Sequence, residues 1–257
     1  MMRLLADMHV HTVLSPCAAR DMTPPAIVRE AVRKGLGMIA VCDHNSAANV
    51  EAVMAAASHA AAGAHALVVI AGMEITTAEE AHVLGLFPDV QAAQGAAAEV
   101  REGLPLWRPL SSNGSPAGMR IPEQEIVDGA GVVIGIEEKM LSSASRFSLS
   151  ETVDLIHRHG GLALAAHMDR RSFSVPSQLG FLPPDVPFDG LEISAAGVAR
   201  GRAAGFAVHG LPLVTSSDSH FLDDIGTSAT AFEVEQPDFG ELALALAGSG
   251  GRGCAIA

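Results

Sequence analysis

A repeated alternation between short apolar runs and longer, alanine-rich amphipathic segments limits most strongly what this chain can fold into. The apolar runs are bounded by Gly, Pro, Asp or Ser and predict strands at 4–8, 38–42, 66–71, 162–166, 191–193 and 211–215. The amphipathic segments predict helices at about 23–35, 46–62, 148–159 and 239–247, with a further alanine-rich helix between the last two strands. This alternation indicates βα units around a parallel sheet, and therefore an α/β fold.

Local signals support these boundaries. Thr23 before Pro24 is typical of a helix start, and Ser148 with Glu151 three residues later forms a capping-box pattern. The run at 66–71 is apolar throughout, which is expected of a strand that is buried on both faces.

One segment, at about 88–140, breaks the rhythm. Within it, residues 104–120 contain three prolines, two glycines and the single tryptophan. Loops longer than about 12–15 residues commonly act as lids or are disordered, and the tryptophan favours a lid over the barrel mouth. Although 257 residues could also hold two small domains, no linker divides them, so we expect a single domain over residues 1–257.

The charge balance disfavours several kinds of partner. Sixteen basic against 29 acidic side chains leave a net charge of −13, which opposes binding to long nucleic acids. Three scattered cysteines are too few for a disulfide framework. No apolar run approaches the roughly 18 residues of a membrane span, so we expect a cytoplasmic protein with no membrane partner. The oligomeric state stays open.

Metal-ligating residue types gather where the predicted strands end. In an α/β barrel the carboxyl ends of the strands meet at one mouth, where active sites are built. The residues at these positions are Asp7, His9, His11, Asp43, His44, Glu74, His167, Asp218 and His220. We therefore expect them to converge.

The spacing of these residues predicts more than one metal ion. His9 and His11 are two residues apart, so on a strand both imidazoles point to the same face and can reach one ion. Roughly five histidines with two or three carboxylates exceed what one tetrahedral ion needs, which favours two or three divalent ions that share a bridging carboxylate. Glu74 is the candidate bridge. Asp7 and Asp43 are expected to orient the neighbouring imidazoles.

Six motifs in series resemble the polymerase and histidinol phosphatase (PHP) family. They are D-x-H-x-H-T at 7–12, C-D-H-N-S at 42–46, G-M-E-I-T at 72–76, H-x-L-G at 82–85, A-A-H-M-D at 165–169 and S-D-S-H at 217–220. Each motif alone is a weak signal, but their order across nearly the whole chain makes a chance match improbable.

The resemblance implies a distorted (β/α)7 TIM-like barrel that holds up to three metal ions and hydrolyses phosphoesters. By position, the implied ligands are His9, His11, Glu74 and Asp218 for a first ion, Glu74 and His167 with His82 for a second, and His44 with His220 for a third. His82 rests on a short motif and is alternatively a structural histidine.

The third site departs from the family pattern. Family members often present a histidine or aspartate shortly after the first motif, whereas this chain reads S-P-C-A-A-R-D at 15–21. Either Cys17 or, as a second choice, Asp21 supplies the missing ligand of the third ion, or this site is incomplete. A thiolate ligand favours zinc or iron over manganese, so the identity of the ions among these three stays open.

The leading hypothesis is a metal-dependent phosphoesterase in which a metal-activated water attacks a small phosphomonoester or nucleotide-type substrate. His220 or Asp218 would pass a proton to the leaving oxygen. Arg20, Arg170 and Arg171 are candidates to bind the phosphate, with solvated surface arginines as the alternative.

Two other functions stay open. An amidohydrolase or deaminase on a similar barrel shares the H-x-H pattern but usually lacks the tandem D-H-N and S-D-S-H motifs. A non-catalytic metal- or redox-responsive module is suggested by Cys17 at a presumptive metal site. The remaining histidines, which are His59, His65, His157, His159 and His209, are expected on helices and connecting loops with ordinary roles.

Overall fold

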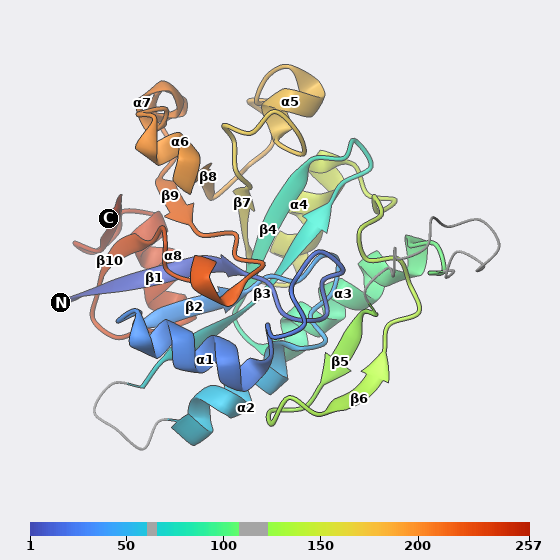
Figure 1. The fold of residues 1–257 in the computed structure, drawn as a ribbon. Coiled ribbons are helices and arrows are strands. Elements are labelled where there is room, and N and C mark those ends of the chain that lie inside the picture. Colours follow the sequence, from blue (N-terminus) through green and yellow to red (C-terminus); the bar gives the residue numbers. More distant parts are fainter. Residues whose placement is uncertain (61–65, 108–122) are drawn as a thin grey trace.

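The centre of the computed structural model, which describes residues 1–60, 66–107 and 123–257, is a sheet curled into a barrel (Figure 1). The strand order is β11-β10-β1-β2-β3-β4-β7-β8-β9. The strands are β1 (Met2–Val10), β2 (Met38–Val41), β3 (Val68–Thr76), β4 (His82–Phe87), β7 (Leu162–Ala165), β8 (Gly190–Ser194), β9 (Leu213–Ser216), β10 (Thr230–Val234) and β11 (Gly253–Ile256). Six of them coincide with the predicted apolar runs.

The seven strands from β1 to β9 form the barrel wall, which confirms the expected distorted barrel. The sheet has nine strands in all, because β10 pairs antiparallel with the first half of β1 and β11 pairs with β10. The wall closes at a seam between β1 and the chain after β9. There His11 N–H donates to Ser219 O at 3.1 Å, and Ser219 N–H donates to His9 O at 3.2 Å.

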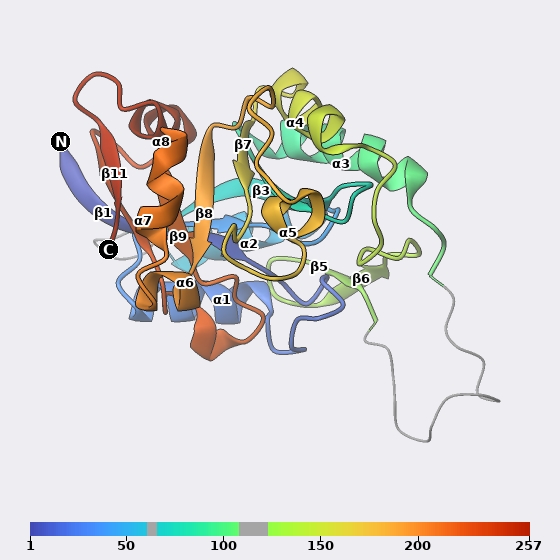
Figure 2. The same cartoon turned by 90° about the horizontal axis from the view of Figure 1, so that it is seen from above.

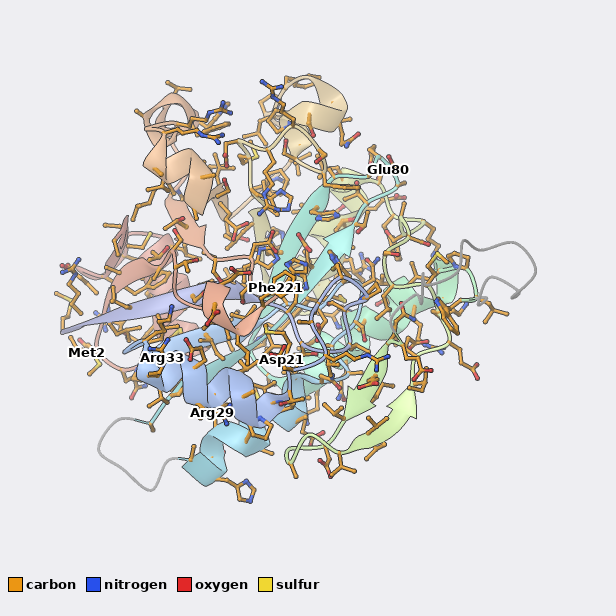
Figure 3. All side chains as sticks on the ribbon, in the orientation of Figure 1. Met2, Asp21, Arg29, Arg33, Glu80 and Phe221 are labelled. Atoms are coloured by element: carbon orange, nitrogen blue, oxygen red, sulfur yellow. The ribbon has the colours of Figure 1, made fainter. Side chains whose placement is uncertain are left out.

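Strand β4 is the main distortion, since it runs antiparallel to both β3 and β7. A short turn at 77–81 joins β3 to β4 as a hairpin, and antiparallel neighbours need no crossover helix. Glu80 in this turn has a φ of 64°, although the turn contains none of the glycine or asparagine residues that usually mark one (Figure 3). Because the sequence has no such turn signal between β3 and β4, the apolar pattern alone did not predict β4 as a separate strand.

The helices pack around the wall as expected, with some changes at their ends. They are α1 (Pro24–Arg33), α2 (Val50–Ala60), α3 (Val90–Gly103), α4 (Leu149–Arg158), α5 (Val175–Leu179), α6 (Ala195–Ala199), α7 (Ala203–Phe206) and α8 (Phe239–Leu246). The predicted capping box at Ser148 and Glu151 is present at the start of α4. The single alanine-rich helix expected before β9 is instead two short helices, α6 and α7, because Gly201 has a left-handed φ of 68° between them.

The described part of the 88–140 segment consists of α3 and a hairpin of β5 (Glu125–Val127) and β6 (Val133–Ile136). The hairpin lies on the opposite side of the barrel from β11 and α8 (Figure 2). Asn45 Nδ2 donates to the carbonyls of Leu141 and Ser143, and Asn49 Nδ2 donates to that of Glu125, so this segment is tied to loops at the mouth. Residues 108–122, which include most of the predicted lid, lie outside the described residues, and the lid stays a prediction.

Two apolar layers support the mouth. One fills the space between the wall and the surrounding helices and includes Ile39, Val83 and Ile156. The other fills the barrel interior and includes Met8 and Cys42. Among the described residues, no helix is both long enough and apolar enough to cross a membrane.

We expect Gly72→Ala to lower the free energy of unfolding by about 1–3 kcal/mol, because overpacking strains a close-packed core. A Cβ on Gly72 would lie 2.7 Å from Cys42 Sγ and 2.8 Å from Val41 O, and the carbonyl belongs to a neighbouring strand that cannot move freely. Urea denaturation measures the change. Gly205→Ala is the matched control, because nothing lies within 4 Å of its added Cβ. Equal stabilities for the two variants would contradict this packing of β2 on β3.

Candidate metal centre

The barrel mouth gathers eight of the predicted ligands. They come from the ends of β1, β3 and β7, from the first residue of β4, and from loops after β2 and β9. These residues are His9, His11, His44, Glu74, His82, His167, Asp218 and His220. His82 joins them because the reversed β4 places its first residue opposite Thr76, at the same end of the barrel as Glu74.

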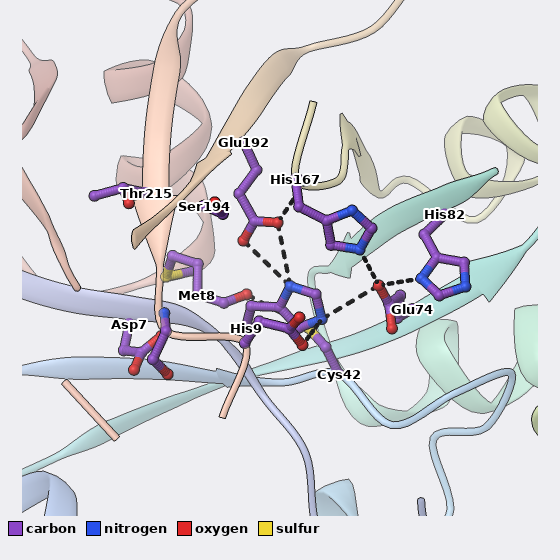
Figure 4. Close-up of polar contacts among 12 residues, drawn as sticks. Asp7, Met8, His9, Cys42, Glu74, His82, His167, Glu192, Ser194 and Thr215 are labelled. Atoms are coloured by element: carbon purple, nitrogen blue, oxygen red, sulfur yellow. Dashed lines mark hydrogen bonds and ion pairs between the residues drawn. The ribbon is translucent and has the colours of Figure 1, made fainter. Parts of the chain in front are cut away.

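Glu74 lies at the centre of this cluster and is 1% exposed. Its Oε1 lies 2.7 Å from His82 Nδ1 and 3.2 Å from His167 Nε2 (Figure 4). Its Oε2 lies 2.9 Å from His44 Nδ1. Burial raises the pKa of the Glu74 carboxyl, but His82, His9 and His44 outweigh it and hold this pKa well below its usual range. Glu74 is therefore a carboxylate at neutral pH.

His9 and His11 direct two lone pairs at one point. Ser15 Oγ donates to Asp43 at 2.7 Å, so His11 Nδ1 donates to Ser15 Oγ at 3.0 Å and its Nε2 carries no proton. His9 Nδ1 likewise donates to Glu192 at 3.2 Å, so in a neutral His9 the lone pair is on Nε2. These two Nε2 atoms are 3.1 Å apart. Two acceptors at this distance repel each other unless a proton or a metal cation lies between them.

Carboxylates complete the surroundings of this point. Asp218 Oδ1 lies 3.1 Å from His11 Nε2 and 3.3 Å from His9 Nε2. Burial disfavours a charged His9, but Asp218, Glu192 and Glu74 reverse the effect and raise its pKa well above the usual value. Burial, with His220 nearby, lowers the pKa of His11. The site therefore favours positive charge at the point where four buried acceptor groups converge.

Among the described residues, three groups of side chains lie close enough together to hold cations. The first group is His9, His11, Glu74 and Asp218, the second is His44, Glu74 and His82, and the third is His11, His44 and His220. The first matches the implied first site. The second contains the implied Glu74 and His82 but has His44 in place of His167, and the third contains the implied His44 and His220 together with His11. Nitrogen and carboxylate donors of this kind fit zinc, iron or manganese.

The two candidates for the gap in the third group differ. Cys17 is exposed and lies beside His220 and His44. Burial of its sulfur raises the pKa of the thiol, but hydrogen bonds with these two histidines lower it to about 7. Asp21 is exposed (Figure 3), and neither Cys17 nor Asp21 belongs to any of the three groups.

Glu192 is a site residue that the sequence analysis missed. It is 1% exposed on β8, accepts from His9 Nδ1, and accepts from His167 N at 2.9 Å (Figure 4). It therefore fixes the ring orientation of one ligand and the backbone of another. The available signal was a glutamate in the middle of an apolar strand, L-E-I, where an unpaired charge would be costly.

Asp43 and Asp7 were both expected to orient imidazoles, but their hydrogen-bond partners differ. Asp43 accepts from Ser15 Oγ, which in turn holds His11, so Asp43 orients an imidazole through one hydroxyl. Asp7 contacts no imidazole ring. It accepts from Ser217 N at 3.0 Å and from Gly226 N at 2.8 Å, and so fixes the loop that carries Asp218. Burial raises the pKa of Asp7 to about 6, against these hydrogen bonds.

Backbone strain is concentrated at the same mouth. His167, Asp218 and Asn45 have φ values of 29°, 51° and 49°, a region that residues other than glycine seldom occupy. Each such residue costs of the order of 1–3 kcal/mol and persists only where its surroundings enforce it. Here the enforcing contacts include the hydrogen bonds of His167 N and of the Asn45 side chain.

The candidate phosphate-binding arginines separate into two places. Arg170 Nη1 lies 2.5 Å from Asp218 Oδ2, so Arg170 reaches the cluster. Arg171 is exposed and lines a hollow next to Arg170. Arg20 is exposed on the loop after β1 and lines neither of the hollows around Arg170.

The described histidines that were expected to have ordinary roles lie outside the cluster. His59 Nδ1 bonds to the carbonyl of Ala55, His157 pairs with Asp189, and His159 pairs with Glu99. His209 is exposed beside Phe206, and His65 lies outside the described residues.

Comparison with known proteins agrees with the motifs. The PHP domain profile matches residues 7–173, and a PHP-associated profile matches residues 199–247. No curated protein matches the sequence.

Several solved structures share the fold. Endonuclease Q from Pyrococcus furiosus, a lesion-specific endonuclease, has a TM-score of 0.67 at 18% identity, and the match covers 98% of this chain and 58% of that one. A candidate metal-dependent phosphoesterase from Bifidobacterium adolescentis has a TM-score of 0.55 at 21% identity, over 84% and 87% of the two chains. An amidohydrolase from Chromobacterium violaceum has a TM-score of 0.57 at 20% identity, over 86% and 89%. The chain thus spans little more than half of endonuclease Q.

We expect iodoacetamide to alkylate Cys17 with a rate that rises with pH around a midpoint of about 7, because the reactive thiolate replaces the thiol there. Mass spectrometry of the metal-free protein measures this rate, with Cys17→Ser as the control. Cys42 is buried and Cys254 is half-buried, and burial raises both of their pKa values. If Cys17 is a ligand, added Zn²⁺ slows the reaction. A midpoint near 9 would contradict the lowered pKa of Cys17, and a rate that Zn²⁺ does not change would exclude its role as a ligand.

Proposed function

The chain belongs to the PHP domain family, and from this premise we propose that it is a metal-dependent phosphoesterase acting on a small phosphomonoester or nucleotide-type substrate. The observation that carries the proposal is the convergence of His9, His11, Glu74 and Asp218 on one point, with Arg170 beside it. Buried acceptors suit bound cations, and a partly exposed guanidinium suits a phosphoryl group.

Two or three divalent ions, when bound here, would lower the pKa of a nucleophilic water and polarise the phosphoryl oxygens. The ligands we propose are the eight clustered residues together with Cys17. Glu192 holds His9, and the Asp43–Ser15 pair holds His11, so the rings are oriented before any substrate arrives. Such preorganisation removes the cost of reordering the ligands during the reaction.

Arg170 is the residue best placed to bind the phosphate. One of its nitrogens contacts Asp218, and the side chain remains 41% exposed at the mouth. A guanidinium has further N–H groups in its plane, and these can donate to phosphoryl oxygens while Asp218 keeps the side chain oriented.

His220 is a better proton donor than Asp218 for the leaving oxygen. The Asp218 carboxylate is paired with His9, His11 and Arg170, and its pKa is held below its usual range, although burial opposes this. It therefore carries no proton to give. His220 Nδ1 donates to the carbonyl of Asp218 at 2.9 Å, so a transferable proton would lie on Nε2, and Cys17 hydrogen-bonds to the same ring.

We expect Glu74→Gln to lose most of the bound transition metal and at least about 10²-fold in kcat/KM for an aryl phosphate, because a neutral amide cannot bridge cations among these imidazoles. Plasma emission spectrometry counts the metal, and release of p-nitrophenol follows hydrolysis. Glu51→Gln, an exposed change on α2, is the control. Full hydrolysis by protein treated with a chelator would refute the proposed function.

We expect His220→Asn to slow hydrolysis of an alkyl phosphate by about 10²–10⁴-fold and that of p-nitrophenyl phosphate much less, because only a poor leaving group needs the proton. Steady-state kinetics on both esters, with the metal content of the variant, separates the two roles of this residue. Equal losses on both esters together with lost metal would assign His220 to metal binding alone.

Amide hydrolysis is a second candidate, because one structural neighbour is described as an amidohydrolase. Parallel assays on aryl phosphates and aryl amides distinguish the two activities. Endonuclease Q has been crystallised with a 27-mer duplex that carries an abasic lesion. For this chain, the net charge of −13 favours a small substrate over an extended duplex.

A further inference from the structure

Two adjoining hollows open beside the metal centre, where α5, α6 and α7 stand beyond the ends of β7, β8 and β9 (Figure 1). Their volumes are about 690 and 430 Å³, and Arg170, Arg171 and Arg202 line both of them. Arg200 and Ser217 line the smaller one. Ser217 directly precedes Asp218, and Arg170 contacts Asp218. The smaller hollow, which both Ser217 and Arg170 line, therefore adjoins the proposed phosphate site.

Three arginines of these hollows, Arg171, Arg200 and Arg202, differ from most of the other described arginines by their lack of counter-charges. Elsewhere in the described residues five arginines pair with glutamates, and the pairs are Arg33–Glu30, Arg101–Glu137, Arg146–Glu102, Arg158–Glu99 and Arg252–Glu241. Within the part of the chain that the structure describes, Arg171, Arg200 and Arg202 form no ion pair. Three uncompensated guanidinium groups in a chain of net charge −13 form a local positive surface.

Asp169 also lines both hollows, but both oxygens of its carboxylate accept hydrogen bonds from Ser194. Its Oδ1 accepts from Ser194 N and its Oδ2 from Ser194 Oγ, both at 2.8 Å. A Cβ on Gly197 would lie 2.4 Å from Oδ2, so the helix backbone closes over this group. Asp169 therefore fixes the wall and does not pair with the arginines. Arg202 Nη1 donates to its backbone carbonyl at 3.2 Å, which positions that side chain.

We propose that Arg171, Arg200 and Arg202 form a second anion-binding subsite, named here the arginine subsite, which binds a second phosphate group of the substrate. The inference rests on the proposed function and narrows its substrate class to small bisphosphates, with one phosphoester at the metal centre and the other phosphate in the arginine subsite. The two volumes suit a metabolite-sized ligand. Phosphate is the anion whose geometry guanidinium groups match bidentately.

The test compares matched substrates that differ only in the second phosphate. The substrates are 1,3-propanediol and 1,5-pentanediol bisphosphates and the corresponding monophosphates. We expect the protein to prefer at least one bisphosphate by tenfold or more in kcat/KM. Arg200→Ala should lower this preference about tenfold, since it removes one charge-assisted contact. Arg29→Ala, which removes an arginine on α1 that is also without an ion pair, should retain it (Figure 3).

A binding measurement separates this inference from the proposed function. Calorimetry with pentane-1,5-bisphosphonate and pentylphosphonate reports the arginine subsite without hydrolysis. Tighter binding of the bisphosphonate that Arg200→Ala weakens, in a protein without phosphoesterase activity, would support the subsite and refute the function. Hydrolysis of aryl phosphate with no preference for either bisphosphate, or with equal preferences in the Arg200→Ala and Arg29→Ala variants, would overturn the subsite. Stronger inhibition by an oligothymidylate than by either bisphosphonate would also overturn it, in favour of a nucleic-acid strand.

Discussion

The buried carboxylate of Glu74, surrounded by imidazoles, is the interaction on which the rest of the mouth depends. A glutamate at the end of an apolar strand is costly to bury unless cations or donors compensate its charge. His44, His82 and His167 lie within 3.2 Å of its oxygens and come from three different segments of the barrel. The fold brings these segments together, and the reversal of β4 is the part of the fold that adds His82. The hydrogen bonds of Glu192, Ser15 and Asp43 then fix the rings around this carboxylate.

Much of the site could be predicted from the sequence, because apolar strands and their ends are readable in one dimension. Once His9 and Glu74 are assigned to strand ends, barrel topology requires them to meet. The family motifs supplied His82, whose position depends on an antiparallel strand that the apolar pattern did not indicate. Glu192 was not predicted as a site residue because it lies within a strand, whereas the candidate residues were sought at strand ends. The α3 helix and the β5–β6 hairpin of the 88–140 segment were not predicted. Their region is held to the mouth by hydrogen bonds from the side chains of Asn45 and Asn49 to the carbonyls of Leu141 and Glu125, and sequence patterns do not show such long-range contacts.

The charge distribution explains how an acidic chain can present a site for anions. The carboxylates at the mouth, Glu74, Asp218 and Glu192, are all turned inward to histidines or to Arg170. Asp169 is turned into its own helix end by Ser194. The exposed charge on the α5–α7 side of the mouth is therefore carried by arginines. The net charge acts on an extended polyanion that covers much of the surface, whereas the field that a small ligand meets at the mouth depends on where the charges lie.

The seam of the barrel has a mechanical consequence. Backbone hydrogen bonds at Ser219, together with the carboxylate of Asp7, hold β1 to the chain after β9. His9 and His11 lie on one side of this joint, and Asp218 lies on the other. A cation bound between them would cross-link the two sides of the seam, so loss of metal would destabilise the barrel wall as well as the active site. Amide protons along the seam would then exchange with solvent as a unit, and the occupancy of the mouth would set how long the barrel stays closed.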